Sequence, residues 1–252
     1  MNVHSEHACG RMRLCTGVLL TSSRSRVLVS VLILIVATAG ACLWFAWRMG
    51  YSLDFRPPLR VDQVLSGVDG NRNGTDDSLD IVAGARKQIE LRPIYRSAYY
   101  DGGYPPDSEG VCTDVLWRAF LDAGYDWKRA VDGDIAAATG SYPRIHGTTP
   151  DPNIDFRRVP NLYAFLSRKA TELTAEVRPW DRDNLKEWQP GDLVIFGPGN
   201  DHIGIVSDKR RRDGVPLVIH HGWATPVEDN ILEYWGDRIT AHFRVDLSSL
   251  ER

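Results

Sequence analysis

Cysteine is scarce in this 252-residue chain, which holds only four. Three of them, Cys9, Cys15 and Cys42, lie within the first 47 residues, so Cys112 is alone in the remainder. A single cysteine cannot form an internal disulfide, which excludes a disulfide-rich secreted scaffold. A lone thiol is then either a small buried apolar side chain or a reactive group with a function.

The sequence also lacks an excess of charge of either sign. The net charge is -3, which excludes a polycation built to bind nucleic acid. Charged residues make up 25% and hydrophobic residues 43% of the chain. These shares exclude wholesale disorder and a polytopic membrane protein, and they favour one folded domain with appendages.

One segment, residues 27–47, has no Asp, Glu, Lys, Arg or His at all. As a helix these 21 residues would span roughly 31 Å, about one hydrocarbon core. Residues 1–26 hold four arginines against one glutamate, and such a basic flank stays in the cytoplasm. We therefore expect a single-pass signal-anchor, with the C-terminal part on the outer side of the membrane.

Two alternatives for this segment stay open. A-x-A patterns end at Ala39 and Ala41, so a cleaved signal peptide and a secreted protein are possible outcomes. Cys42 is also a candidate for lipidation. The expected organisation is a basic cytoplasmic segment, a signal-anchor, a stem and a folded domain, at residues 1–26, 27–47, 48–66 and 67–252.

The folded domain places helices first and strands second. Apolar spacing predicts helices near residues 79–89, from Cys112 to just before Gly124, and after Pro160. Short β-branched runs separated by turn residues predict strands at 192–197, 202–207, 215–220 and 239–245. This order indicates an α+β domain with an antiparallel sheet.

Cys112 opens a predicted helix, where the helix dipole and free backbone N–H groups favour the thiolate and lower its pKa. A nucleophilic thiolate needs a general base. His202 begins one predicted strand and His220 ends the next, so antiparallel pairing could place them together, with His220 orienting His202. His221 is the adjacent alternative to His220, but side chains alternate along a strand, so only one of the two can face the site.

Three strand motifs resemble the NlpC-type branch of the papain-like cysteine hydrolases. They are GDLVIF at 191–196, HIGIV at 202–206 and VIH at 218–220. The resemblance implies an α+β papain-like domain whose nucleophile starts a helix packed on the antiparallel sheet. It implies that Cys112 is the nucleophile, His202 the general base and His220 the third, orienting residue.

The same resemblance implies that a tyrosine about twelve residues before the nucleophile assists the oxyanion site, and Tyr99 and Tyr100 both fit. One departure is local. The branch usually reads Asp-Cys-Ser-Gly around the nucleophile, whereas this chain has Val-Cys-Thr-Asp at residues 111–114. The surroundings of Cys112 therefore differ from those of the branch.

Longer motifs resemble a bacterial family of YijF-like proteins with a domain of unknown function (DUF1287), over about residues 67–246. They are GYPP at 103–106, GVCTDV at 110–115, NIDFRRVPNL at 153–162 and WQPGD at 188–192. Arg157 and Arg158 lie in the third motif, where they could bind a substrate carboxylate or clamp a loop.

An acidic loop over residues 69–80 has the spacing of a calcium loop, with oxygen-bearing side chains at loop positions one, three, five, nine and twelve and Gly74 at the sixth. The candidate ligands of a structural Ca²⁺ are Asp69, Asn71, Asn73, Thr75, Asp77 and Asp80. The other interpretation is a polar turn followed by an Asp or Ser helix cap. No cofactor is expected for catalysis, because His202 and His220 with no second cysteine make a poor zinc set.

Together with the resemblance, these patterns predict a cysteine hydrolase, an amidase or peptidase, anchored in the bacterial inner membrane and facing the periplasm or the exterior. The location and the NlpC-type resemblance imply that its substrate is an amide bond in the cell envelope, first of all in peptidoglycan stem peptides. Two other functions remain open: a catalytically silent cell-wall binding module, and a papain-like acyltransferase. Nucleic acid is not an expected partner.

Overall fold

The computed structural model of the chain describes residues 23–51, 55–143 and 149–250. Most of the predicted basic segment, with Cys9 and Cys15, lies outside the described residues. The chain divides into two compact units, residues 1–44 and 45–252. Helix α1 (Ser23–Arg48) is long and apolar enough over Ser25–Arg48 to cross a membrane, and is a candidate membrane span or signal sequence.

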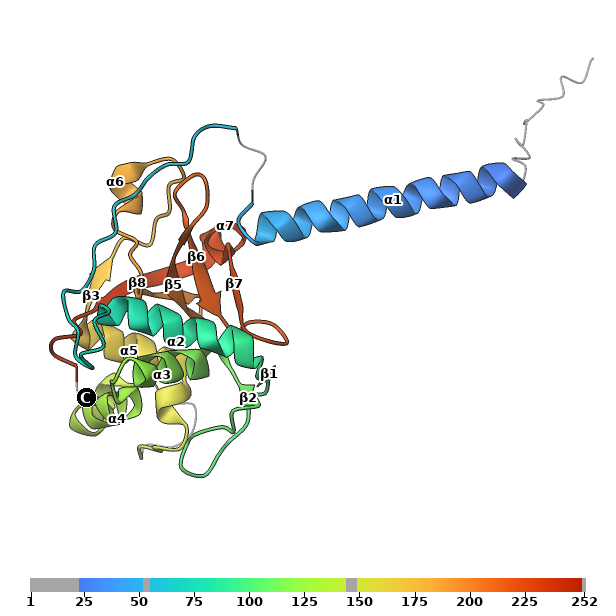
Figure 1. Cartoon of the computed structure of the whole chain (residues 1–252). Helices are drawn as coiled ribbons and strands as arrows, with labels where there is room; N and C mark the ends of the chain where they lie inside the picture. The colour runs from blue at the N-terminus through green and yellow to red at the C-terminus, as the bar shows by residue number, and fades with distance from the viewer. Residues whose placement is uncertain (1–22, 52–54, 144–148, 251–252) are drawn as a thin grey trace, which may run out of the picture. The chain divides into compact units, whose positions relative to one another are not determined.

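A six-stranded antiparallel sheet forms the centre of the second unit, with strand order β3-β8-β4-β5-β6-β7 (Figure 1). Its strands are β3 (Ala170–Leu173), β4 (Leu193–Phe196), β5 (His202–Arg210), β6 (Pro216–His220), β7 (Val227–Asp229) and β8 (Ile239–Val245). Strands β4, β5, β6 and β8 are the four predicted ones. The α+β class and the antiparallel sheet are therefore confirmed.

Four longer helices pack on one face of this sheet (Figure 1). They are α2 (Asp77–Leu91), α3 (Cys112–Asp122), α4 (Trp127–Ala137) and α5 (Val159–Lys169). Because strand side chains alternate, Ile203, Ile205 and Ile219 point to this helix-covered face and join the main core. Val206 and Val218 point the other way, into a second core cluster with Leu232.

Shorter elements complete the unit. Helices α6 (Arg182–Leu185) and α7 (Ile231–Tyr234) contribute to the second core cluster. A two-stranded parallel ladder joins β1 (Ile94–Tyr95) to β2 (Glu109–Gly110), directly before α3. Single 3₁₀ turns lie at Thr139–Ser141, Asp155–Arg157 and Gly236–Arg238.

The described part of the predicted stem lies against the domain. The N–H of Leu59 donates to the carbonyl of Arg212 at 2.8 Å, and the N–H of Val64 donates to the Gln189 side chain at 2.9 Å. Leu59 and Val61 also pack on the second core cluster. Residues 55–66 therefore belong physically to the folded unit.

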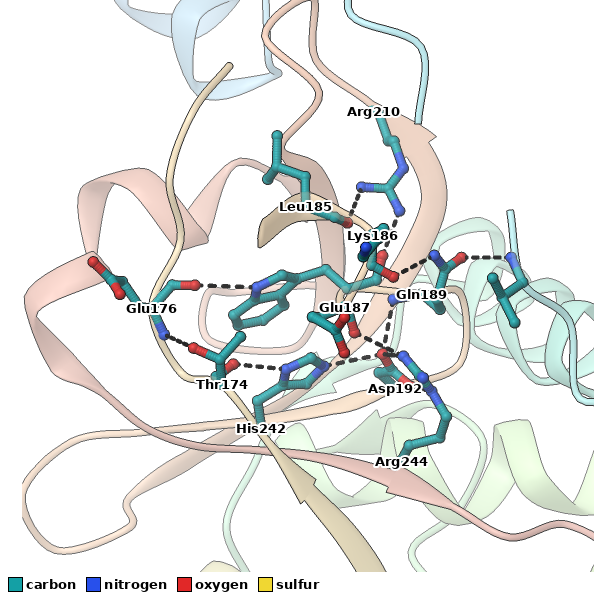
Figure 2. Close-up of polar contacts among 12 residues, drawn as sticks. Thr174, Glu176, Leu185, Lys186, Glu187, Gln189, Asp192, Arg210, His242 and Arg244 are labelled. Carbon is teal, nitrogen blue, oxygen red and sulfur yellow. Dashed lines mark hydrogen bonds and ion pairs between the residues drawn. The ribbon is translucent and has the colours of Figure 1, made fainter. Parts of the chain in front are cut away.

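Asp192, the aspartate of the GDLVIF motif, anchors β4 to β8 (Figure 2). It is buried and accepts hydrogen bonds from Arg244 at 2.7 Å, from His242 Nε2 at 3.0 Å and from the backbone of Gln189 at 2.7 Å. Trp188 stacks on the His242 ring at 3.8 Å. The motif thus has a structural reason for its aspartate, and His242 has its polar partners here.

Candidate active site

Cys112 is the first residue of α3, as predicted. The N–H of Val111 donates to Asp114 Oδ2 at 2.8 Å, which satisfies a donor at the helix start and fixes the first turn. The thiol is 4% exposed. Backbone N–H groups of Ile203, Thr113 and Cys112 itself point toward the sulfur.

The thiol is not the low-pKa group that its place at a helix start predicts. Burial raises the pKa of Cys112 to about 11, and the charge of Asp114 acts in the same direction. The backbone N–H groups lower it by less, because a charged sulfur loses more hydration here than these dipoles restore. That prediction is therefore wrong for the resting site, where the thiol is protonated at neutral pH.

Asp114 and Arg157 form a buried ion pair behind the thiol. Arg157 donates through Nε at 2.7 Å and Nη2 at 2.8 Å to the two carboxylate oxygens, and both side chains are at most 2% exposed. Arg158 is paired with Asp155 at 3.0 Å. The two arginines considered for substrate binding are thus both bound to carboxylates, and Arg157 clamps its loop to the start of α3.

His202 and His220 lie together, with Nε2 of His202 at 3.0 Å from Nδ1 of His220. The chain of contacts continues to Asp229, whose Oδ1 lies 3.2 Å from Nε2 of His220. His202 is 7% exposed and the other two are fully buried. Sequence reasoning found the two histidines and missed Asp229, which ends the short strand β7.

Asp229 is surrounded by donors. Arg48 donates to it through Nε at 3.0 Å and Nη2 at 2.9 Å, the hydroxyl of Tyr234 lies 3.0 Å from both oxygens, and the N–H of Ile231 lies at 3.2 Å. Burial acts to raise the pKa of Asp229, but the contacts with His220 and Arg48 outweigh it and hold the pKa below its usual range. Asp229 is therefore a carboxylate at neutral pH.

This carboxylate determines where the ring protons lie. It can only accept, so Nε2 of His220 carries a hydrogen and Nδ1 of a neutral His220 accepts. Nε2 of His202 then donates to that nitrogen, which leaves Nδ1 of His202 with a lone pair. Burial, then the charges of His220 and His221, lower the pKa of His202 to about 3, so in the resting site its ring is neutral and only a weak base.

Cys112 contacts the backbone at the start of β5, but its side chain lies on the helix-covered face of the sheet and those of His202 and His220 lie on the other face. Its sulfur faces the N–H of Ile203, the residue after His202. Cys112 and Ile203 belong to the main core, whereas the His202 ring packs against Phe196 and Trp235 at the second cluster, with ring centres 6.0 and 5.5 Å apart. Within the described chain, no side-chain hydrogen bond joins the sulfur to an imidazole, so proton transfer requires the two groups to approach.

A second imidazole lies on the helix-covered side. His221 follows Ile219 by two residues and so points to the same face, where the charge of Asp114 acts on it. It is fully buried, its ring meets that of Tyr95 edge-on at 5.2 Å, and the backbone of Ala224 is its polar neighbour. Burial lowers its pKa. Strand alternation thus separates His221 from His220 as expected, yet leaves His221 on the side of Cys112.

The two tyrosines considered for the oxyanion site have other partners. The hydroxyl of Tyr100 donates to Glu109 at 2.6 Å, and that of Tyr99 accepts from Asn153 at 2.8 Å. Tyr95 is instead the tyrosine near the thiol, because β1 pairs it with Gly110, two residues before Cys112. Burial, followed by the charge of Cys112, raises the pKa of Tyr95. Its position seventeen residues before Cys112 lies outside the spacing that sequence reasoning used.

The acidic loop before α2 is closed by its own hydrogen bonds. The backbone N–H groups of Asn73 and Gly74 donate to Asp69, and Asp80 accepts from side-chain amides of the loop at 2.8 Å. Asp76 caps α2 by accepting from the N–H of Ser78. In the described residues no group of three or more His, Cys, Asp or Glu could hold a metal ion. The geometry is that of a polar turn with an aspartate cap, and calcium stays a prediction.

Comparison with known proteins places this site in a family. The family described as domain of unknown function (DUF1287) matches residues 82–245, a range that includes Cys112, both paired histidines and Asp229. The chain belongs to the DUF1287 family. A relative in this family is the uncharacterized protein YijF of Escherichia coli (strain K12). It is 40% identical over 191 residues, which cover 73% of this chain and 87% of YijF.

Proposed function

We propose that this DUF1287 protein is a cysteine amidohydrolase of NlpC-like type that cleaves an amide bond in the bacterial cell envelope. The observation that carries the proposal is the hydrogen-bonded chain from His202 through His220 to Asp229, together with the position of Cys112 at the N-terminus of α3, where its sulfur faces the N–H of Ile203, the residue after His202. A nucleophile, a base and the groups that orient that base are the parts that covalent acyl transfer requires.

In the proposed reaction, the Cys112 thiol gives its proton to Nδ1 of His202 as the sulfur attacks the substrate carbonyl carbon. The oxyanion that forms accepts a hydrogen bond from the Cys112 N–H. The intermediate then expels the amine, which takes the proton from His202, and a thioester remains. Water attacks the thioester, His202 accepts its proton and returns it to the sulfur, and the carboxylic acid leaves.

The resting site holds a neutral thiol and a neutral imidazole rather than a preformed ion pair. Substrate binding must therefore bring the sulfur and Nδ1 of His202 together before proton transfer. His220 and Asp229 favour this step because they stabilise the imidazolium that it creates. Such a site reacts with small electrophiles at neutral pH more slowly than a preformed thiolate does, because the proton must first pass to His202.

Peptidoglycan stem peptides are the proposed substrate class. The reason is the N-terminal apolar helix, which supports a protein anchored in or exported across the inner membrane, together with the NlpC-type resemblance. The folded unit would then face the periplasm or the exterior, where peptidoglycan lies.

The test is digestion of purified peptidoglycan from several wall chemotypes by the full chain in detergent. Wild type and Cys112→Ala are compared, and released fragments are weighed by mass spectrometry. Fragments from wild type alone, each with a new carboxylate, support the proposal and identify the bond. Fragments from both proteins refute it, and an amine-linked product assigns acyl transfer.

A second candidate, a wall-binding module without catalysis, is favoured by one observation: the thiol is 4% exposed and its pKa is raised. Cosedimentation with purified sacculi distinguishes the two. A silent module binds saturably, with the same affinity for wild type and Cys112→Ala, and releases no fragments at any pH.

A further inference from the structure

We infer that Arg48, the last residue of α1, is a positioning residue of the proposed active site, acting through Asp229. The inference deepens the proposed function and rests on it. Arg48 directly follows the apolar segment, in a region that the sequence predicts to be the start of a stem. The inference gives this residue a part in the chemistry.

The Arg48 side chain is held in place by several contacts. Its guanidinium donates twice to Asp229 Oδ2, at 3.0 and 2.9 Å, and its side chain is 14% exposed. The same group lies 4.1 Å from the ring centre of Trp223 and 5.3 Å from that of Tyr234. The N–H of Asn230 donates to the Arg48 carbonyl at 2.9 Å. Aromatic faces and charge together hold the guanidinium in one place.

The neighbouring residue is bound to the same helix, α7. The Trp47 indole donates to Glu233 at 3.3 Å, and its ring centre lies 6.2 Å from that of Tyr234. Residues 45 onward also belong to the same compact unit as the site. The end of α1 is therefore part of the folded domain.

The charge of Arg48 explains how Asp229 remains an acceptor. A buried carboxylate without a cation takes up a proton more readily. A protonated Asp229 could donate to Nε2 of His220, which moves the His220 hydrogen to Nδ1. Nε2 of His202 would then accept, and the remaining hydrogen of a neutral His202 would lie on Nδ1, where the base needs a lone pair. Arg48 thus acts on the base, His202, through two intervening residues, Asp229 and His220.

A consequence concerns processing. Cleavage after Ala39 or Ala41 leaves Arg48 in the protein, so a secreted form keeps the complete site. A protein that begins at residue 51 lacks it. The competent folded unit therefore includes the last residues of α1, whether or not the apolar segment is retained.

The experiment follows alkylation of Cys112 by iodoacetamide between pH 6 and 10 in the full chain in detergent. The modified Cys112 peptide is quantified by mass spectrometry, apart from the other cysteines. Arg48→Met is compared with Arg48→Lys, which keeps the charge, and with Arg168→Met, which removes an arginine from the distant Asp134. The groups facing Asp229 are His220, Tyr234 and Arg48, and those facing His202 are His220 and His221.

We expect Arg48→Met to slow alkylation of Cys112 about tenfold near pH 7. The difference in rate between this variant and wild type should narrow toward pH 10, where the thiol ionises without a base. Arg48→Lys should recover most of the rate and Arg168→Met should match wild type. A folded Arg48→Met with the wild-type pH profile overturns the inference. If Arg48→Met does not fold, Arg48→Gln, which also removes the charge, decides: a wild-type pH profile in folded Arg48→Gln also overturns the inference. Because no wall substrate is used, failure of the proposed hydrolysis would appear separately, as no turnover by wild type.

Discussion

Replacing Asp229 by asparagine keeps the shape of the side chain and removes its charge. Arg48 has only donors, so the side-chain carbonyl of the new asparagine will turn toward it and the amide N–H₂ toward His220. His220 must then accept at Nε2 and carry its hydrogen on Nδ1. That hydrogen points at Nε2 of His202, which forces the His202 hydrogen onto Nδ1 and removes the lone pair that receives the thiol proton.

The expected loss in kcat is about 10²- to 10⁴-fold, the range that a positioned general base contributes. This corresponds to about 3–5 kcal/mol of transition-state free energy. KM should change little, because none of the three residues in the chain binds substrate in this account. Stability should fall by about 1–3 kcal/mol, since a buried charge-assisted hydrogen bond is weakened.

The pH dependence of stability has a definite sign. The pKa of Asp229 is lowered in the folded state, so its contribution to stability is fully present above its unfolded pKa of about 3.9 and is lost as the pH falls from that value through the lower folded pKa. The melting temperatures of wild type and Asp229→Asn should therefore differ at pH 7 and converge on acidification.

The assay measures kcat and KM on the fragment-releasing substrate, with thermal melting at pH 7 and pH 3. Nitrogen-15 NMR of the histidine rings reports directly which nitrogen of each ring is protonated. An Asp229→Asn variant with wild-type kcat and unchanged ring tautomers would refute the reasoning about the chain.

Three further predictions follow from the packing of the site. In Gly222→Ala the new Cβ lies 3.1 Å from His220 Nδ1 and 3.2 Å from His202 Cε1, so kcat should fall about tenfold. The control Gly236→Ala has open space around the new Cβ and should keep the wild-type kcat. Equal kcat values for the two variants would contradict the account. Arg157→Met leaves Asp114 buried and unpaired and should cost about 3–5 kcal/mol in urea unfolding. Arg178→Met, which breaks an exposed pair, should leave urea unfolding almost unchanged, and equal effects of the two substitutions would be evidence against the buried clamp. His202→Phe should abolish turnover and His221→Phe should retain it when fragments are counted; the opposite pattern would assign the base to His221.

Much of the fold was predictable because its signals are local. Apolar residues spaced four positions apart after Cys112, followed by the glycine at 124, predict α3, which runs from Cys112 to Asp122. The four predicted strands are each a compact β-branched run. By contrast, β7 has three residues and α7 has four, too few for any period to be visible. The helix predicted after Pro160 is α5, which ends at Lys169, directly before β3 begins.

The residues of the candidate site that lie in sequence motifs were predictable. Features that depend on burial, or on contacts between residues far apart in the sequence, were not. Cys112, His202 and His220 come from motifs. Asp229 and Arg48 are 181 residues apart and meet only through tertiary packing. The thiol pKa was predicted with the wrong sign because a sequence shows a helix start and its dipole but not how deeply the sulfur is buried.

The central claim is that Cys112 forms a covalent bond to the substrate acyl group. The most direct measurement is the intact mass of the full chain, quenched in acid during turnover of peptidoglycan, with the adduct mapped by peptide mass spectrometry. We predict a mass increase equal to the acyl part of the released fragment, located on Cys112 and removed by neutral hydroxylamine as expected of a thioester. Turnover with an unmodified Cys112 in wild type, or turnover that persists in Cys112→Ala, would contradict the account.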